Sequence, residues 1–276
     1  MENKNNEIQE RIKILIEHLK EYNDAVVLIG NNAVKEKWLF QATENNEETY
    51  SRKALAKEPE KFWANFLEVS GYEDDKCIQR RKPNKTQLGI KTLLDMNVAK
   101  TLIDMNPDNA LQEFIGNQIE YIPLKGSLDK VYCVKCLKEL DYNPDIKVTD
   151  NKPILHSDYE DTDCTGKIQP TIPFYGRPYN IKLTDKIKDA IFVTDEDGKV
   201  TLNTHTLILI GPDMTEDYLY DIVNSYKAIR GKFNKEHMLI IIDESNISLF
   251  EFGPEFGTEK DISGSIERLI DLIKGE

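Results

Sequence analysis

Apolar residues in this chain fall into short continuous runs that alternate with stretches of helical periodicity. Over residues 6–22 the apolar positions recur at the spacing of one helix face, which predicts an amphipathic helix. Continuous runs rich in β-branched residues are typical of buried parallel strands. These runs cover residues 24–30, 99–105, 206–210 and 238–243. A weak alternation over residues 247–252 predicts an edge strand.

Helical periodicity fills the intervals between these runs. Asn84, followed three residues later by Gln87, makes the capping-box pattern that begins a helix. Further helices are predicted over residues 61–69, 215–229 and 265–274. Strands that alternate with helices in this way predict an α/β fold, in which a doubly wound, Rossmann-like parallel sheet carries helices on both faces.

The alternation is interrupted over residues 117–180, so we expect a small inserted module there. The large domain is then built from residues 1–116 and 181–276. In parallel sheets of this kind, ligands bind beyond the carboxyl ends of the strands. The predicted ends lie at Gly30, Asn106, Gly211 and Asp243. We expect these four ends to line one cleft.

The composition excludes several classes of partner. With 276 residues and 39% hydrophobic content, the chain is long enough to bury a proper core. Its formal net charge of -13 argues against nucleic acid and anionic membrane surfaces, because phosphates would be repelled. No run approaches the roughly 20 apolar residues that span a bilayer, and the polar start of the chain lacks the apolar core of a signal peptide. We therefore expect a cytoplasmic protein.

Two cysteines at Cys-x-x-Cys spacing indicate a metal site. Cys133 and Cys136 can both face one ion, because two intervening residues let their sulfurs point to the same centre. Asp161 and Cys164, three residues apart, could form the opposing half. Zinc accepts a carboxylate oxygen beside thiolates, so these four ligands are chemically reasonable. His156 is a second candidate for the fourth ligand, and the alternative is a vestigial knuckle without metal.

The motifs around these cysteines resemble those of the sirtuins, the NAD-dependent protein deacylases. Residues 125–128 (Lys-Gly-Ser-Leu), a short strand and the Cys-x-x-Cys pair are similar to the family's His-Gly-Ser-Leu, strand and first cysteine pair. Residues 106–108 (Asn-Pro-Asp) are similar to its Gln-Asn-Ile-Asp. The loop Pro173–Gly176 resembles the family's loop that clamps an acyl-lysine peptide. The resemblance implies the sirtuin fold, NAD and zinc as cofactors, and a protein or peptide partner at residues 173–176.

The resemblance also implies which residues would hold the cofactor. They are Gly30, Asn32, Asn106, Asp108, Gly211 and Asn246. Asn32 replaces a family glycine at which the backbone must come close to the cofactor's phosphates. Gly211 is followed by Pro212, which lacks a backbone N–H donor, and by Asp213, which places a negative charge where a phosphate would approach. These departures weaken the expected binding of NAD at this site.

Lys125 occupies the position of the family's catalytic histidine, which relays a proton from the ribose of NAD. An imidazole can accept a proton near neutral pH because its pKa is about 6.5, whereas a lysine side chain is only a donor while it is charged. The catalytic residue is therefore unknown. We expect Lys125 to be a solvated turn lysine or, as a rarer alternative, to pair with Asp108 or Asp213.

Together these patterns predict a divergent sirtuin-fold protein with eroded catalytic motifs. We expect it to be inactive as a deacylase and to act as a nucleotide-sensing or protein-binding module. The alternative is an NAD-dependent protein-lysine deacylase or ADP-ribosyltransferase. A third hypothesis is NAD cleavage without a protein acceptor.

Overall fold

The structure is a computed structural model. It describes residues 2–30, 33, 50–70, 72–73, 76–77, 83–107, 110–112, 114–172, 180–212, 217–230, 236–243, 246–249 and 262–275. Four features named above lie outside the described residues: Asn32, Asp108, Asp213 and the loop Pro173–Gly176. Asn246 is described through its backbone alone.

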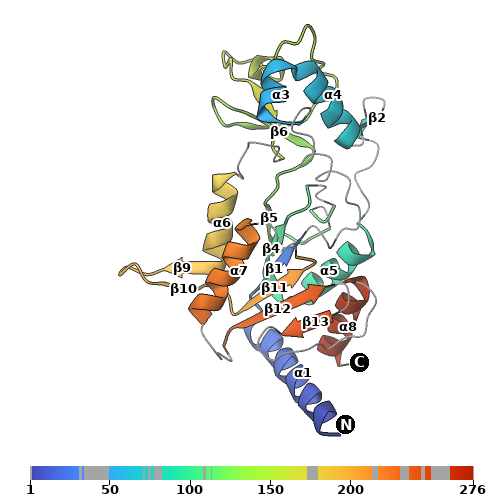
Figure 1. Cartoon of the computed structure of the whole chain (residues 1–276), viewed down its shortest axis with the longest axis vertical. Coiled ribbons are helices and arrows are strands. Elements are labelled where there is room, and N and C mark those ends of the chain that lie inside the picture. Colours follow the sequence, from blue (N-terminus) through green and yellow to red (C-terminus); the bar gives the residue numbers. More distant parts are fainter. Residues whose placement is uncertain are drawn as a thin grey trace.

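A six-stranded sheet forms the centre of the large domain (Figure 1). Five neighbouring strands are parallel, and β13 runs antiparallel at the edge. In spatial order the strands are β13 (Asn246–Leu249), β12 (Met238–Asp243), β11 (Thr206–Ile210), β1 (Ala25–Ile29), β4 (Ala99–Asp104) and β5 (Glu120–Pro123). This order confirms the predicted Rossmann-like α/β fold and adds β5, which the sequence did not predict.

Helices cover both faces of the sheet because its central strands are apolar on both sides. One face packs against α1 (Glu2–Tyr22), α5 (Lys85–Asp95) and α8 (Ile262–Lys274), and the other against α6 (Ile181–Ile191) and α7 (Asp217–Arg230). Within β1, Val27 and Ile29 belong to the first core, and Val26 and Leu28 to the second. The alternation of side chains along a strand thus fills two separate cores.

The start of α5 shows how the sequence sets a helix boundary. The backbone N–H of Gln87 donates to Asn84 Oδ1 over 2.8 Å, and the backbone N–H of Asn84 donates to Gln87 Oε1 over 2.9 Å. The predicted capping box is therefore confirmed.

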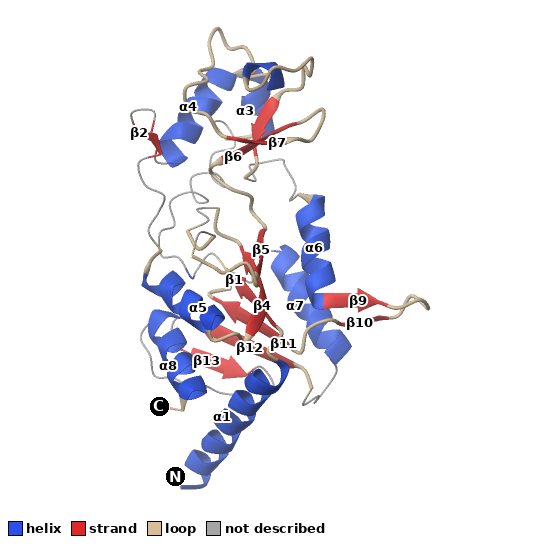
Figure 2. Cartoon of the chain, turned by 180° about the vertical axis from the view of Figure 1, so that it is seen from behind, coloured by secondary structure: helices blue, strands red, loops and turns tan. Residues whose placement is uncertain are grey.

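A small module lies at one end of the molecule and α1 at the other (Figure 2). Its three-stranded antiparallel sheet has the order β7-β6-β8. The module contains α3 (Arg52–Lys57), α4 (Pro59–Ser70), β6 (Lys130–Cys133), β7 (Glu139–Asp141), the 3₁₀ turn η2 (His156–Asp158) and β8 (Ile168–Pro170). Two further antiparallel pairs are β2 (Tyr72–Glu73) with β3 (Lys76–Cys77), and β9 (Phe192–Thr194) with β10 (Val200–Leu202).

The module is built from two segments of the chain. Phe62 and Trp63 of α4 share one hydrophobic core with Val131 and Cys133 of β6. Trp63 stacks on Tyr142, with ring centroids 5.8 Å apart. The predicted division into residues 1–116 with 181–276 and residues 117–180 stays a prediction, but this packing places α3 and α4 with the small module. Conversely, the pairing of β5 with β4 places residues 120–123 in the large sheet.

An aromatic and histidine cluster closes the amino end of the sheet. His205, just before β11, stacks on Tyr22 with centroids 3.9 Å apart and on His237 with centroids 5.2 Å apart. Its Nδ1 lies 2.7 Å from Asp24 Oδ2, just before β1. These contacts tie the end of α1 to the starts of three parallel strands.

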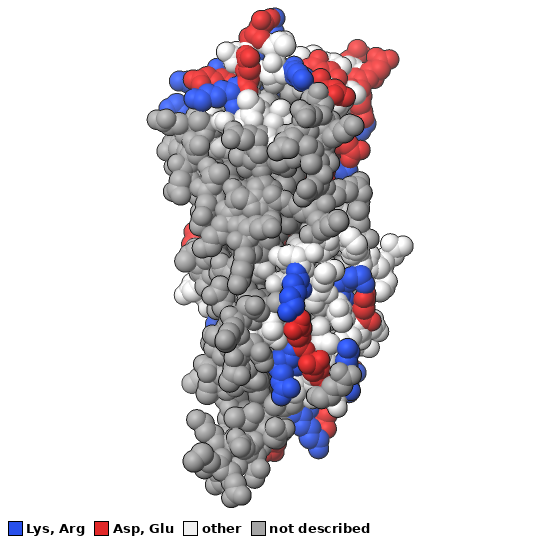
Figure 3. Space-filling model, turned by 90° about the vertical axis from the view of Figure 1, so that its right-hand side faces the viewer, with Lys and Arg blue, Asp and Glu red and all other residues white. Residues whose placement is uncertain are grey.

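The surface of the described residues carries charges of both signs. Figure 3 shows basic and acidic side chains interspersed over the described part of one side. No helix in the described ranges combines the length and the apolarity that crossing a bilayer requires.

Candidate functional site

The carboxyl ends of the parallel strands meet at one edge of the sheet, as the sequence predicts. The backbone N–H of Gly30 donates to the carbonyl of Ile210 over 2.8 Å, and that of Met105 to the carbonyl of Ile29 over 3.0 Å. Leu124 likewise bonds to Asp104 over 2.9 Å. The ladder thus continues past the strands and brings the loops that follow them together. We call this region the carboxyl edge.

Gly30 is required by how closely two backbones approach at the carboxyl edge. A Cβ added at residue 30 would lie 2.2 Å from the carbonyl oxygen of Gly211 and 2.7 Å from Cα of Pro212. Both neighbours are backbone atoms, which cannot move aside as a side-chain end can. Of the predicted cofactor residues, Gly30 and Gly211 are therefore in contact.

A buried carboxylate, Asp104, lies at the end of β4 and is missing from the sequence prediction. Asp104 is fully buried (0% exposed). Its Oδ1 accepts the backbone N–H of Asn106 at 2.8 Å and the side-chain N–H of Asn106 at 3.0 Å, and Oδ2 accepts the hydroxyl of Tyr121 at 3.0 Å. Asn106 is thus held in place at the carboxyl edge. A charged residue ending an apolar strand was the feature that could have revealed Asp104.

Lys125 is buried, so the prediction of a solvated turn lysine is wrong. Only 2% of the residue is exposed. It lies in a tight turn after β5, in which the N–H of Gly126 donates to the carbonyl of Pro123 over 2.9 Å. Its predicted alternative partners, Asp108 and Asp213, lie outside the described residues. The structure therefore places an amine inside the protein where the sirtuin resemblance has an imidazole.

The backbone around Lys125 is locked by the small module. Gly126 has a left-handed backbone (φ 73°), and a Cβ there would lie 2.6 Å from the carbonyl oxygen of Thr171. The Thr171 hydroxyl accepts the N–H of Ser127 over 2.9 Å and donates to the Ser127 carbonyl over 2.7 Å. The position of Lys125 is thus fixed by contacts between the β5 turn and the end of β8.

Four potential metal ligands gather in the small module. The ligand atoms of Cys133, Cys136, His156 and Cys164 all lie within 4.8 Å of one another. Cys133 Sγ is 3.6 Å from Cys164 Sγ, and Cys136 Sγ is 3.3 Å from His156 Nδ1. Three sulfurs and one imidazole nitrogen are a donor set that tetrahedral zinc uses in structural sites. The residues therefore fit zinc.

The fourth member of this cluster corrects the prediction of Asp161. Asp161 is exposed and is not part of the group, whereas His156 is buried (3% exposed). The 3₁₀ turn η2 begins at His156, whose backbone N–H donates to the carbonyl of Gly166 over 2.8 Å. This turn directs the imidazole inward. His156, the second candidate for the fourth ligand, is the residue that the structure groups with the three cysteines.

The backbone of both halves of the cluster packs around Cys133. The N–H of Cys133 donates to the carbonyl of Lys138, which closes the Cys-x-x-Cys turn over 2.9 Å. A Cβ at Gly166 would lie 2.2 Å from Cys133 Sγ, so only glycine fits against this sulfur. The backbone N–H of Gly166, and next the side chain of His156, lower the pKa of the Cys164 thiol to about 7. The thiolate is the form that binds a metal.

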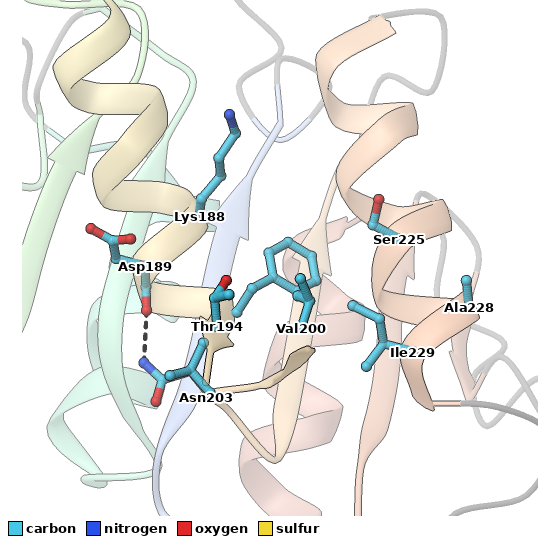
Figure 4. Close-up of a pocket in the computed structure, with 10 residues that line it drawn as sticks. Lys188, Asp189, Thr194, Val200, Asn203, Ser225, Ala228 and Ile229 are labelled. Carbon is cyan, nitrogen blue, oxygen red and sulfur yellow. Dashed lines mark hydrogen bonds between the residues drawn. The ribbon is translucent and has the colours of Figure 1, made fainter. Parts of the chain in front are cut away.

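A separate pocket of about 900 Å³ lies between the β9–β10 hairpin and helices α6 and α7 (Figure 4). Phe192, Val200 and Ile229 contribute apolar surface. The side-chain amide of Asn203 donates to the carbonyl of Asp189 over 2.7 Å at one side. None of the predicted cofactor residues lines this pocket.

The fold and the donor cluster define a Rossmann-like α/β protein that carries a metal-binding module beyond its sheet. The model of the Sir2 family matches residues 34–208, which is more than half of the chain. The chain therefore belongs to the Sir2 family, in agreement with the sirtuin resemblance of its motifs.

Individual relatives agree with this assignment. An NAD-dependent protein deacetylase of Fusobacterium nucleatum is 26% identical over 172 residues, which cover 62% of this chain and 54% of the relative. The chain thus spans about half the length of the curated relatives it matches.

Solved structures show the same fold over nearly the whole chain. A complex of a Sir2 homologue with NAD has a TM-score of 0.66 at 17% identity and covers 95% of this chain and 93% of that one. A Sir2 mutant with a p53 peptide and NAD has a TM-score of 0.58 at 16% identity and covers 96% and 99%.

Proposed function

We propose that this chain is a Sir2-family protein that does not deacylate lysine and acts as a nucleotide-sensing or protein-binding module. The observation that carries the proposal is Lys125. It occupies the position of the family's catalytic histidine, and it is buried at the carboxyl edge.

The chemistry of an amine explains why this replacement matters. The family mechanism needs a group that takes a proton from a ribose hydroxyl. A charged lysine has three N–H donors and no acceptor, so it cannot take that proton. Losing a general base typically lowers a rate by about 10²- to 10⁴-fold. While it carries its proton, the amine would also repel the positive charge that develops on the ribose when the nicotinamide bond breaks.

Nucleotide binding is the part of the family's function that the remaining groups favour. Gly30 and Gly211 keep the close backbone approach at the strand ends, and Asn106 is held by Asp104. The relatives described above are named as NAD-dependent or contain NAD. We propose that NAD or a related adenine nucleotide binds at the carboxyl edge, with Gly30, Asn32, Asn106, Asp108, Gly211 and Asn246 as its contacts.

Zinc and a protein partner complete the proposal. Zinc would be held by Cys133, Cys136, His156 and Cys164, and it would fix the two halves of the small module together. A peptide in the related p53 complex motivates a peptide or protein partner at the loop Pro173–Gly176. The described cysteines are free thiols, which suits a reducing compartment such as the cytoplasm.

Calorimetric titration with NAD, combined with an assay for released nicotinamide, tests the proposal. A matched pair of variants locates the binding site. Asn106→Ala removes a side chain at the carboxyl edge, whereas Asn203→Ala removes the same side chain beside the separate pocket of α6 and α7. We expect NAD to bind the wild type and Asn203→Ala, to bind Asn106→Ala more weakly, and to stay intact.

Each outcome of this titration has a definite meaning. Binding without nicotinamide release supports a nucleotide sensor. No binding supports a protein-binding module. Nicotinamide release at the rate of an active sirtuin overturns the proposal.

The second candidate function is an NAD-dependent protein-lysine deacylase or ADP-ribosyltransferase. It is favoured by the names of the curated relatives and by the match of the Sir2 model over residues 34–208. An acetylated peptide distinguishes the two candidates, because an active deacylase releases nicotinamide faster when the peptide is present.

A further inference from the structure

The metal cluster has a polar partner outside its four ligands. Glu160 lies four residues after His156, and its Oε2 is 3.2 Å from His156 Nε2. The same oxygen is 2.5 Å from Nζ of Lys138, the residue whose carbonyl closes the Cys-x-x-Cys turn. A continuous chain of contacts therefore runs from Lys138 through Glu160 to His156 and on to Cys136 Sγ.

We propose that Glu160 is the positioning residue of the metal centre: it holds His156 so that Nδ1 faces the three sulfurs, while Lys138 holds Glu160. A carboxylate only accepts hydrogen bonds, so the ring nitrogen that contacts it must carry the proton. That nitrogen is Nε2. The lone pair then belongs to Nδ1, which lies 3.3 Å from Cys136 Sγ and is available to a metal.

The local backbone explains why Glu160 reaches His156. Residues four apart lie on the same face of a helical turn. The N–H of Glu160 donates to the carbonyl of His156 over 3.2 Å, which closes such a turn. Asp158 stabilises its start, because its Oδ2 accepts the N–H of Leu155 over 2.7 Å. The His156 side chain is 4% exposed, so Glu160 is the group through which it meets the surface.

The contact between Glu160 and Lys138 also joins the two halves of the metal site. Lys138 follows Cys136 by two residues, and Glu160 precedes Cys164 by four. The ion pair therefore links the two segments that a zinc ion would itself bridge. A carboxylate that accepts from a metal-binding imidazole fixes its orientation and raises its strength as a ligand.

Zinc affinity measured by competition with a chromophoric chelator tests the proposal. Glu160→Ala should weaken zinc binding by about 10- to 100-fold, the range for lost outer partners of metal ligands. Asp161→Asn is the matched control: it removes a neighbouring negative charge that is exposed and outside the cluster. We expect it to leave the affinity unchanged. Lys138→Met should have an effect between the two.

The ring nitrogen that binds the metal is read separately by long-range ¹H–¹⁵N NMR of the zinc-loaded protein. In the wild type we expect His156 to carry its proton on Nε2 and to bind zinc through Nδ1. Glu160→Gln keeps an oxygen that can accept this proton's hydrogen bond, so it should keep the tautomer and lose part of the affinity. It also carries the test if Glu160→Ala does not fold.

Two results would overturn the proposal. One is an equal zinc affinity for Glu160→Ala, Glu160→Gln and Asp161→Asn, which would make the Lys138–Glu160 pair a surface ion pair without influence on the metal. The other is a His156 proton on Nδ1 in the zinc-loaded wild type, which would place the metal at Nε2 instead. Neither readout depends on NAD or on any activity of the chain.

Discussion

The metal centre and the carboxyl edge each contain a residue that departs from the sirtuin pattern. In the metal centre, His156 completes a group in which the resemblance implies a fourth cysteine. At the carboxyl edge, Lys125 stands in place of a histidine. The first exchange preserves the chemistry, because zinc binds nitrogen as well as sulfur. We propose that the second does not, because an amine that carries its proton has no lone pair with which to accept another. A site survives substitution when its task is to donate an electron pair to a metal.

The largest effect that we expect comes from removing the metal. A structural zinc ion contributes about 10–16 kcal/mol of apparent binding free energy in small zinc-dependent peptides. Chelation should therefore unfold the small module and leave the sheet in place. Trp63 packs in the same core as Cys133, so its fluorescence reports on the module in a Trp38→Phe background. An unchanged Trp63 spectrum after complete removal of the metal would show that the module does not depend on it.

The next effect comes from Gly30→Ala at the carboxyl edge. The added Cβ would meet two backbone atoms, the Gly211 oxygen at 2.2 Å and Pro212 Cα at 2.7 Å. We expect a loss of about 3 kcal/mol in the free energy of unfolding, at the upper end for overpacking. Gly198→Ala is the control, since no atom lies within 4 Å of its Cβ position and its left-handed backbone alone costs about 1–2 kcal/mol. Urea unfolding measures both, and equal losses would contradict the tight contact.

A smaller loss of stability is expected at low pH from His237, which lies at the amino end of the sheet. Burial, and next the neighbouring His205, lower the pKa of His237. The unfolded chain therefore takes up this proton at a higher pH than the folded chain does. The free energy of unfolding should fall as the pH drops through the ordinary histidine pKa of about 6.5.

His237→Gln should remove this part of the acid sensitivity and leave the part that comes from proton competition for the metal ligands. Hydrogen exchange of the β12 amides between pH 7 and pH 5 measures the sheet separately from the module. The same loss of protection in wild type and variant would show that His237 does not contribute.

The last prediction is a substitution that we expect to have no effect on deacylation. Lys125→His should not restore deacylation, because Pro212 and Asn32 also depart from the family pattern. Nicotinamide release in the presence of an acetylated peptide measures this, with Lys125→Met as the silent control. Turnover in the Lys125→His variant but not in Lys125→Met would show that the carboxyl edge lacks activity because of this single side chain.

Much of the fold was predictable from local patterns. The five-residue strands β1 and β11 are buried at every position, so their sequences are apolar throughout and could be recognised. β5 was missed because only one of its four residues, Ile122, is buried, so its sequence is not a continuous apolar run. The association of α4 with the small module depends on packing between Trp63 and Tyr142, which are far apart in the sequence.

The site residues were less predictable because their positions also depend on contacts between segments that are far apart in the sequence. Spacing identified three of the metal-ligand group, but the direction of the η2 turn decided between His156 and Asp161. Lys125 was expected at the surface because lysine is rarely buried, but it is 2% exposed. The turn that holds it packs against Thr171, which is far away in the sequence. The predictions for Asn32, Asp108 and the loop Pro173–Gly176 stay predictions, since these residues lie outside the described ranges.

The two-segment construction of the small module affects how the protein can be made. The aromatic residues of α4 pack against residues as far along the chain as Ile172, which are synthesised much later. In the same way, β1 has no partner on one side until β11 is synthesised. On the ribosome, Phe62, Trp63 and Phe66 would thus leave the exit tunnel well before their packing surface exists. A fragment that ends ahead of β8 would expose this aromatic face, and a chaperone that recognises apolar helices would find its binding surface there.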